Sequence, residues 1–173
     1  MNFLNHYKTS MPEDTNILNL LSYSVGLFIP NIIFFFPFHK YDLAKNRINK
    51  LIRLAEKNRF TIIKAFLVGM TNHYIGDSFS YENRLSNILE RESYMKNFSR
   101  EINYLKNKEI DNEITRTVNN YFNVNAIFES IDKIYQVYSY MSDSKLEENK
   151  RILYDYLIIN RLTNKIYSSI VFF

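Results

Sequence analysis

The sequence has no cysteine and no tryptophan, and it has only three glycines and three prolines among 173 residues. Without cysteine, neither a disulfide scaffold nor a thiolate zinc site can form. So few glycines and prolines also leave too few tight turns for a β-sandwich or β-barrel, which needs one about every 8–12 residues. We therefore expect an all-α protein, and the length suits a single domain spanning residues 1–173.

Charge of neither sign is concentrated. The net charge of +4 comes from 22 basic and 18 acidic residues spread along the chain without a basic tract, which does not favour nucleic acid as a partner. The first 14 residues lack the basic start, apolar stretch and small-residue cleavage site of a signal peptide. These features predict a cytoplasmic protein that binds no nucleic acid.

Residues 15–38 carry no charge, and this is nearly the length of a membrane span. Pro30, Asn31 and Pro37 interrupt the apolar run, and the backbone groups they leave unpaired are poorly tolerated in lipid. The favoured interpretation is a buried helix followed by an irregular apolar loop. A membrane-embedded segment is the alternative.

Apolar residues recur at helical spacing along most of the chain, which predicts a bundle of seven or eight helices. Thr15 is the expected N-cap of the first helix, Pro30 is expected to end it after about residue 28, and a loop then covers 29–40. Asp42 is the expected cap of the next helix. The predicted helices cover 15–28, 42–55, 61–78, 85–98, 102–105, 111–122, 125–141 and 144–159.

The end of the chain carries a clear helix-start signal. Ser144 and Glu147 have the spacing of a capping box, which predicts that the last helix opens there. The tail 166–173 is apolar, and we expect it to dock on the bundle.

The segment 61–78 is apolar nearly all round, which is typical of a helix buried in the middle of a bundle. It carries His73 and Asp77 four residues apart, so both lie on one face, roughly 6 Å apart at their β-carbons. A buried imidazole and carboxylate must either pair with each other or bind a cation. Gly69 and Gly76 favour the close approach of another helix or a ligand shell to this helix.

The stretch GMTNHYIGD (69–77), within 65–83, resembles the helix of the bacterial zinc-dependent phospholipase C family that reads roughly G-x-x-x-H-Y-x-x-D. Upstream, GLFIPN (26–31) and PFHK (37–40) are similar to the family's G-x-x-x-P-D and its proline-flanked histidine. The resemblance covers about residues 20–98. It implies an all-helical phospholipase C/D-like domain in which up to three zinc ions bind and cleave a phospholipid phosphodiester.

The resemblance also implies a set of metal ligands. His39, His73 and Asp77 match ligands of the first zinc, and Asn31 stands in the place of an aspartate. An uncharged Asn31 would weaken binding of a divalent cation at this site.

The other two zinc sites match less completely. For the second ion, Glu92 is the counterpart of a family glutamate, but Asn83 and Ile88 stand where the family has histidines. His6 matches the early histidine that the family uses for the third ion. The sequence thus supports one zinc ion, held by His39, His73, Asp77 and Asn31, with Glu92 as the remaining candidate ligand.

Three functions are compatible with these residues. The first is a divergent phospholipase C-like protein that binds zinc and has weak phosphodiesterase activity toward a phospholipid or small phosphodiester. The second is a degenerate, non-catalytic relative that binds a lipid, a peptide or a protein partner. The third is a helical protein without a site that contacts a membrane peripherally.

Overall fold

The computed structural model describes residues 3–13, 15–33, 40–105, 113–143 and 146–172. All regular secondary structure in these residues is helical, which confirms the all-α prediction. The elements in chain order are α1 (Phe3–Ser10), α2 (Ile17–Ile33), α3 (Tyr41–Lys57), α4 (Thr61–Ser78), the short 3₁₀ helix η1 (Tyr81–Arg84), α5 (Ile88–Leu105), α6 (Glu113–Tyr121), α7 (Ile127–Asp143) and α8 (Glu148–Val171).

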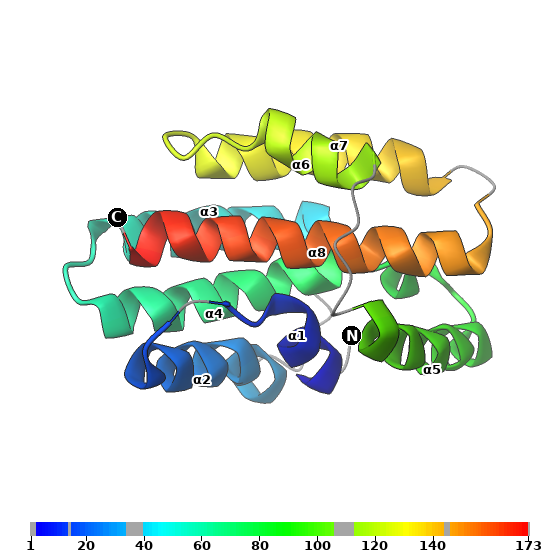
Figure 1. Cartoon of the computed structure of the whole chain (residues 1–173), viewed down its shortest axis with the longest axis horizontal. Helices are drawn as coiled ribbons and strands as arrows, with labels where there is room; N and C mark the ends of the chain where they lie inside the picture. The colour runs from blue at the N-terminus through cyan, green and yellow to red at the C-terminus, as the bar shows by residue number, and fades with distance from the viewer. Residues whose placement is uncertain (1–2, 14, 34–39, 106–112, 144–145, 173) are drawn as a thin grey trace.

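Helices α4 and α8 form the centre of the bundle (Figure 1). Helix α4 packs against α1, α2, α3 and α8, while α8 also contacts α5, α6 and α7. Every side chain of α4 from Thr71 to Ser78 is buried. This confirms the prediction of a central helix, and it places His73 and Asp77 inside the bundle.

Helices α2 and α4 approach each other closely through two glycines. A β-carbon on Gly26 would lie 2.0 Å from the backbone oxygen of Phe66, and one on Gly69 would lie 2.2 Å from that of Tyr23. No other residue type fits at either position without moving a backbone. The expectation that Gly69 marks the close approach of another helix is confirmed.

Helix α2 differs from its prediction at both ends. It continues through Pro30 to Ile33, so the predicted end near residue 28 and the loop at 29–33 are wrong. A proline inside a helix costs about 3 kcal/mol, and the burial of Pro30 together with the α2–α4 packing offsets that cost. The cap is Asn16, whose Oδ1 accepts from the Asn19 N–H at 2.9 Å.

Thr15, the expected N-cap of α2, instead shares a hydrogen bond with the hydroxyl of Tyr167 on α8. Likewise, α3 starts after Lys40, and Asp42 lies in its first turn rather than at its cap. In both cases the helix begins within two residues of the predicted position.

In the second half of the chain, the predicted segments 85–98 and 102–105 merge into one helix, α5, which begins at Ile88, so the predicted start at residue 85 is wrong. Its buried residues Phe98 and Ile102 are four apart and therefore continue a single face. Helix α8 extends to Val171, and Ile166 and Ile170 are buried, so the apolar tail docks as expected. The prediction that the last helix opens at Ser144 is wrong, because α8 begins at Glu148 with Glu147 as its N-cap; Ser144 itself lies outside the described residues.

The uncharged segment 15–38 was the candidate for a membrane span. Among the described residues, none of the helices has both the length and the apolar character needed to cross a bilayer.

Candidate metal centre

Two helices far apart in the sequence carry the candidate site. His73 and Asp77 lie one turn apart on α4, and His6 lies on α1. Hydrogen bonds from other helices fix α1: Asn160 of α8 donates to the Thr9 carbonyl at 3.1 Å, and Ser99 of α5 donates to Asn5 Oδ1 at 3.0 Å. These contacts hold His6 over the buried face of α4.

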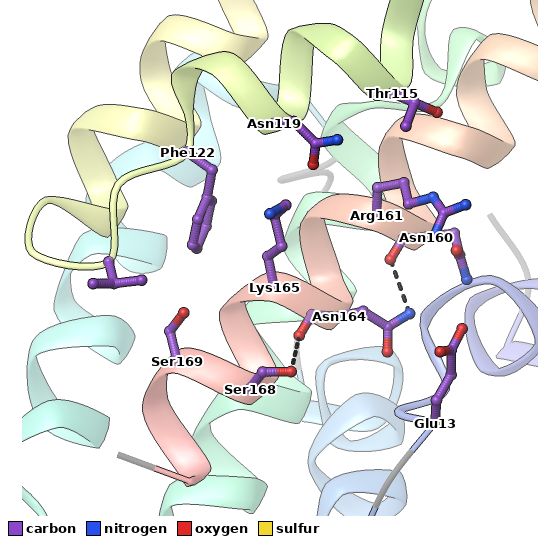
Figure 2. Close-up of a pocket in the computed structure, with 11 residues that line it drawn as sticks. Glu13, Thr115, Asn119, Phe122, Asn160, Arg161, Asn164, Lys165, Ser168 and Ser169 are labelled. Carbon is purple, nitrogen blue, oxygen red and sulfur yellow. Dashed lines mark hydrogen bonds between the residues drawn. The ribbon is translucent and has the colours of Figure 1, made fainter. Parts of the chain in front are cut away.

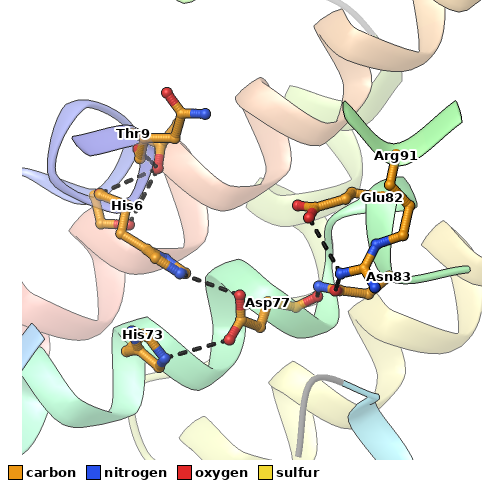
Figure 3. Close-up of polar contacts among 9 residues, drawn as sticks. His6, Thr9, His73, Asp77, Glu82, Asn83 and Arg91 are labelled. Atoms are coloured by element: carbon orange, nitrogen blue, oxygen red, sulfur yellow. Dashed lines mark hydrogen bonds and ion pairs between the residues drawn. The ribbon is translucent and has the colours of Figure 1, made fainter. Parts of the chain in front are cut away.

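Asp77 lies beside the two imidazole rings, with one carboxylate oxygen toward each (Figure 3). Its Oδ1 is 3.1 Å from His6 Nε2, and its Oδ2 is 3.3 Å from His73 Nε2. The ring centroids of the two histidines are 4.3 Å apart. One ligand atom from each of the three residues lies within 4.8 Å of the others. The three side chains therefore converge on one point.

The site is excluded from water, since none of the three residues is more than 3% exposed. Burial lowers the pKa of His6 to about 4, although the nearby Asp77 carboxylate acts in the opposite direction. His6 is consequently neutral at pH 7. A neutral imidazole offers Asp77 no compensating positive charge.

The histidine nitrogens are poorly satisfied. Within the described part of the chain, neither Nδ1 of His6 nor Nδ1 of His73 has a hydrogen-bond partner, and His6 Nε2 is near Asp77 without the alignment of a hydrogen bond. Buried polar atoms usually have partners. Unsatisfied ring nitrogens beside a carboxylate are therefore a feature that requires an explanation.

The predicted metal ligands lie in different parts of the structure. His73 and Asp77 come together as their spacing predicted, whereas His39 lies outside the described residues. Asn31 is exposed near the end of α2, and Glu92 is exposed on α5, while the cluster is buried. His6, which the resemblance assigned to a separate ion, lies in the same cluster as His73 and Asp77.

Asn83 and Ile88, the residues after α4 that the resemblance brought into question, and the neighbouring Glu82 have other surroundings than the cluster. Asn83 Nδ2 donates to the main-chain oxygen of Asp77 at 2.7 Å and thereby satisfies a carbonyl at the C-terminus of α4. Glu82 is buried, and its Oε1 is 3.3 Å from the Arg91 guanidinium. Ile88, at the start of α5, is exposed.

Another buried carboxyl, for which the sequence offers no local signal, belongs to Asp155 on α8. It accepts hydrogen bonds from Tyr138 Oη at 2.6 Å, Tyr94 Oη at 2.8 Å and the backbone N–H of Tyr81 at 2.6 Å. Burial nevertheless raises the pKa of Asp155 to about 6. With three donors in place, this carboxyl joins η1, α5, α7 and α8.

A pocket of about 710 Å³ lies between α8 and the end of α6, and Figure 2 shows the residues that line it. Lys165 lies over the ring of Phe122 there, with its Nζ 5.5 Å from the ring centroid. Arg161 and Glu13 also line the pocket, but no residue of the His6–His73–Asp77 cluster does. The pocket and the candidate metal centre are separate features.

The proximity of His73 and Asp77 could be predicted because four-residue spacing on a helix is a local signal. The position of His6 beside them could not be predicted in this way. The available signals were the scarcity of histidine, with three in the chain, and a glycine at position 76 in a buried helix. Comparison of the chain with family models, curated proteins and solved structures finds no match.

Proposed function

We propose that the chain binds one divalent transition-metal ion, with zinc preferred, through His6, His73 and Asp77. The observation that carries this proposal is the convergence of two imidazole Nε2 atoms and one carboxylate inside the bundle. Imidazole nitrogen and carboxylate oxygen are ordinary zinc ligands, and two histidines with one carboxylate form a three-ligand set that leaves a position open.

Two of the distances are close to those around such an ion. In a tetrahedral site with bonds of about 2.0–2.1 Å, two ligand atoms lie roughly 3.3 Å apart. The His6 and His73 Nε2 atoms are 3.1 and 3.3 Å from the two oxygens of Asp77, and the three ligand atoms lie within 4.8 Å of one another, so a small inward movement of the side chains would complete the site. A bound cation would also compensate the negative charge of the buried Asp77 carboxylate, which the neutral His6 does not do.

Hydrolysis of a phosphodiester is a second candidate function, supported by the resemblance of residues 69–77 to the zinc-dependent phospholipase C helix and by the three-ligand set. Zinc bound there would supply a Lewis acid and an acidified water. The chain's own residues would hold that ion and exclude bulk water. Three described ligands suffice for one ion, however, and the clamp of two ions on the attacking and leaving oxygens would be missing.

Thermal unfolding of chelator-treated protein with and without zinc tests metal binding. If zinc binds only the folded state, a hundredfold excess over its Kd adds about 2.7 kcal/mol, which raises Tm by several degrees in a protein of this size. We expect His6→Ala, His73→Ala and Asp77→Asn each to abolish the zinc-induced shift. The exposed Glu92→Gln serves as the matched control and should retain it.

The size of the zinc-induced shift is the decisive quantity, since removing any of the three buried side chains also changes stability directly. No shift in the wild type with zinc, manganese or iron(II) would contradict the proposal. A shift that survives in His6→Ala but is lost in His39→Ala would instead support the ligand set implied by the resemblance.

A further inference from the structure

The outer face of α2 carries an exposed row of large apolar side chains. Leu18, Leu21, Val25 and Ile32 are each more than half exposed, and Phe28 is 41% exposed. We call these five residues the α2 stripe. Figure 1 shows α2 at the edge of the bundle, with its other side against α4.

The stripe residues are spaced 3, 4, 3 and 4 positions apart, which is the spacing of a coiled-coil seam. In heptad terms Leu18, Val25 and Ile32 occupy a positions, while Leu21 and Phe28 occupy d positions. Two of the three a residues, Val25 and Ile32, are β-branched, and one of the two d residues is a leucine, Leu21; β-branched residues at a with leucine at d favour two-stranded pairing. A helix that only packs on its own core would present its periodic apolar residues inward, but here the seam faces out.

The area of the stripe is at the lower end of what a protein interface needs. Exposed side chains of this size present on the order of 100 Å² each, so the five residues present roughly 500 Å², which is in the upper part of the range of about 300–600 Å² for the largest apolar patch on a typical monomer. Two such stripes face to face would bury roughly 1,000 Å² in total, about the minimum for a specific interface.

Charge distinguishes a protein partner from a lipid surface. Helices that lie in a membrane interface are rimmed by lysine and arginine, whereas α2 has no charged residue in its 17 positions. An uncharged seam also lacks the flanking charges that select a different partner chain. A self-complementary stripe about a twofold axis satisfies both observations.

We propose that the α2 stripe pairs with the same stripe of a second copy of this chain to form a homodimer. Val25 lies at the middle of the stripe, so a twofold axis brings it near its counterpart whether the two helices run parallel or antiparallel. The rest of the bundle, including the His6–His73–Asp77 cluster, faces away from this surface.

Sedimentation equilibrium at protein concentrations on the order of 10–100 μM tests the proposal. We expect a mass of two chains for the wild type and of one chain for Leu21→Glu. The control Leu89→Glu changes the same residue type at an even more exposed site on α5 and should stay dimeric. Circular dichroism verifies that both variants are folded, which is expected because neither side chain is buried.

Cross-linking locates the interface. Because the chain has no cysteine, Val25→Cys introduces a single thiol, and mild oxidation should link most of the protein into dimers. Leu89→Cys should remain unlinked. A monomeric wild type, a dimer that persists in Leu21→Glu, or a failure of Val25→Cys to cross-link would overturn the proposal. A wild type that is monomeric in solution and floats with phosphatidylcholine vesicles would assign the stripe to lipid instead.

Discussion

A β-carbon on Gly76 would lie 2.6 Å from Nδ1 of His6 and 2.9 Å from its Cε1. The imidazole of α1 therefore rests on the bare backbone of α4, one residue before Asp77. Only glycine leaves this space open, so position 76 sets how close the His6 ring comes to the Asp77 carboxylate. The expectation that Gly76 marks a close approach is confirmed.

Gly76→Ala should accordingly weaken metal binding while the bundle stays folded. The added methyl group displaces the His6 ring, and a displacement of a ligand by about 1 Å is enough to spoil a site. We expect at least a tenfold rise in the zinc Kd, measured by competition with a chromogenic chelator. An unchanged Kd would show that His6 is not a ligand.

Stability of the metal-free protein should depend on pH through His6. The pKa of His6 is about 4 in the folded chain, against the ordinary histidine value of 6.5, so the unfolded state binds more protons between these two pH values. The contribution of His6 to the free energy of unfolding is fully present above pH 6.5. As the pH falls toward 4, this contribution decreases by on the order of 3 kcal/mol. Urea unfolding of the wild type and His6→Gln at several pH values checks this, since the difference between them should shrink as the pH falls.

The contribution of Asp155 to stability should change with pH in the direction opposite to that of His6, over nearly the same pH range. Its pKa is raised from 3.8 to about 6 by burial, so the folded state holds a proton that the unfolded state loses. Its contribution is present below pH 3.8 and is lost as the pH rises through about 6. The free energy of unfolding of the wild type relative to Asp155→Leu should therefore decrease between pH 4 and 6. A difference that is constant with pH would contradict the raised pKa.

Asp155→Leu should also be destabilising at every pH. It leaves the buried hydroxyls of Tyr94 and Tyr138 and the N–H of Tyr81 without their acceptor, and each such loss costs about 1–3 kcal/mol. We expect a loss of at least 2 kcal/mol in urea unfolding at pH 7. A variant as stable as the wild type would show that these groups find other partners.

Hydrolysis of a chromogenic phosphocholine ester should be absent or far below that of a complete zinc-dependent phospholipase C. The three described ligands fit one ion, and their burial gives a large substrate no direct access. A spectrophotometric assay with excess zinc measures the rate, and His73→Ala provides the background. Rapid turnover that is lost in His73→Ala would show that further ligands complete a larger cluster.

The positions of most helices could be predicted from the sequence because helix formation leaves a local trace. Helix α4 matches its predicted bounds at both ends, since its apolar residues repeat without a break between Thr61 and Ser78. The neighbouring positions of His73 and Asp77 follow from the same regularity, because any two residues four apart on a helix share a face. Sequence alone thus determined two of the three residues in the candidate centre.

The third residue was decided by tertiary structure. Helix α1 has eight residues, too few to be stable alone, and hydrogen bonds from Ser99 and Asn160 help to hold it in place. His6 meets Asp77 only because these contacts bring together residues that are 71 positions apart (77 − 6). Pro30 remains helical for a related reason: packing against α4 offsets a cost that local propensity cannot. Contacts between distant segments leave no periodic signal in the sequence, so the fold itself had to place them.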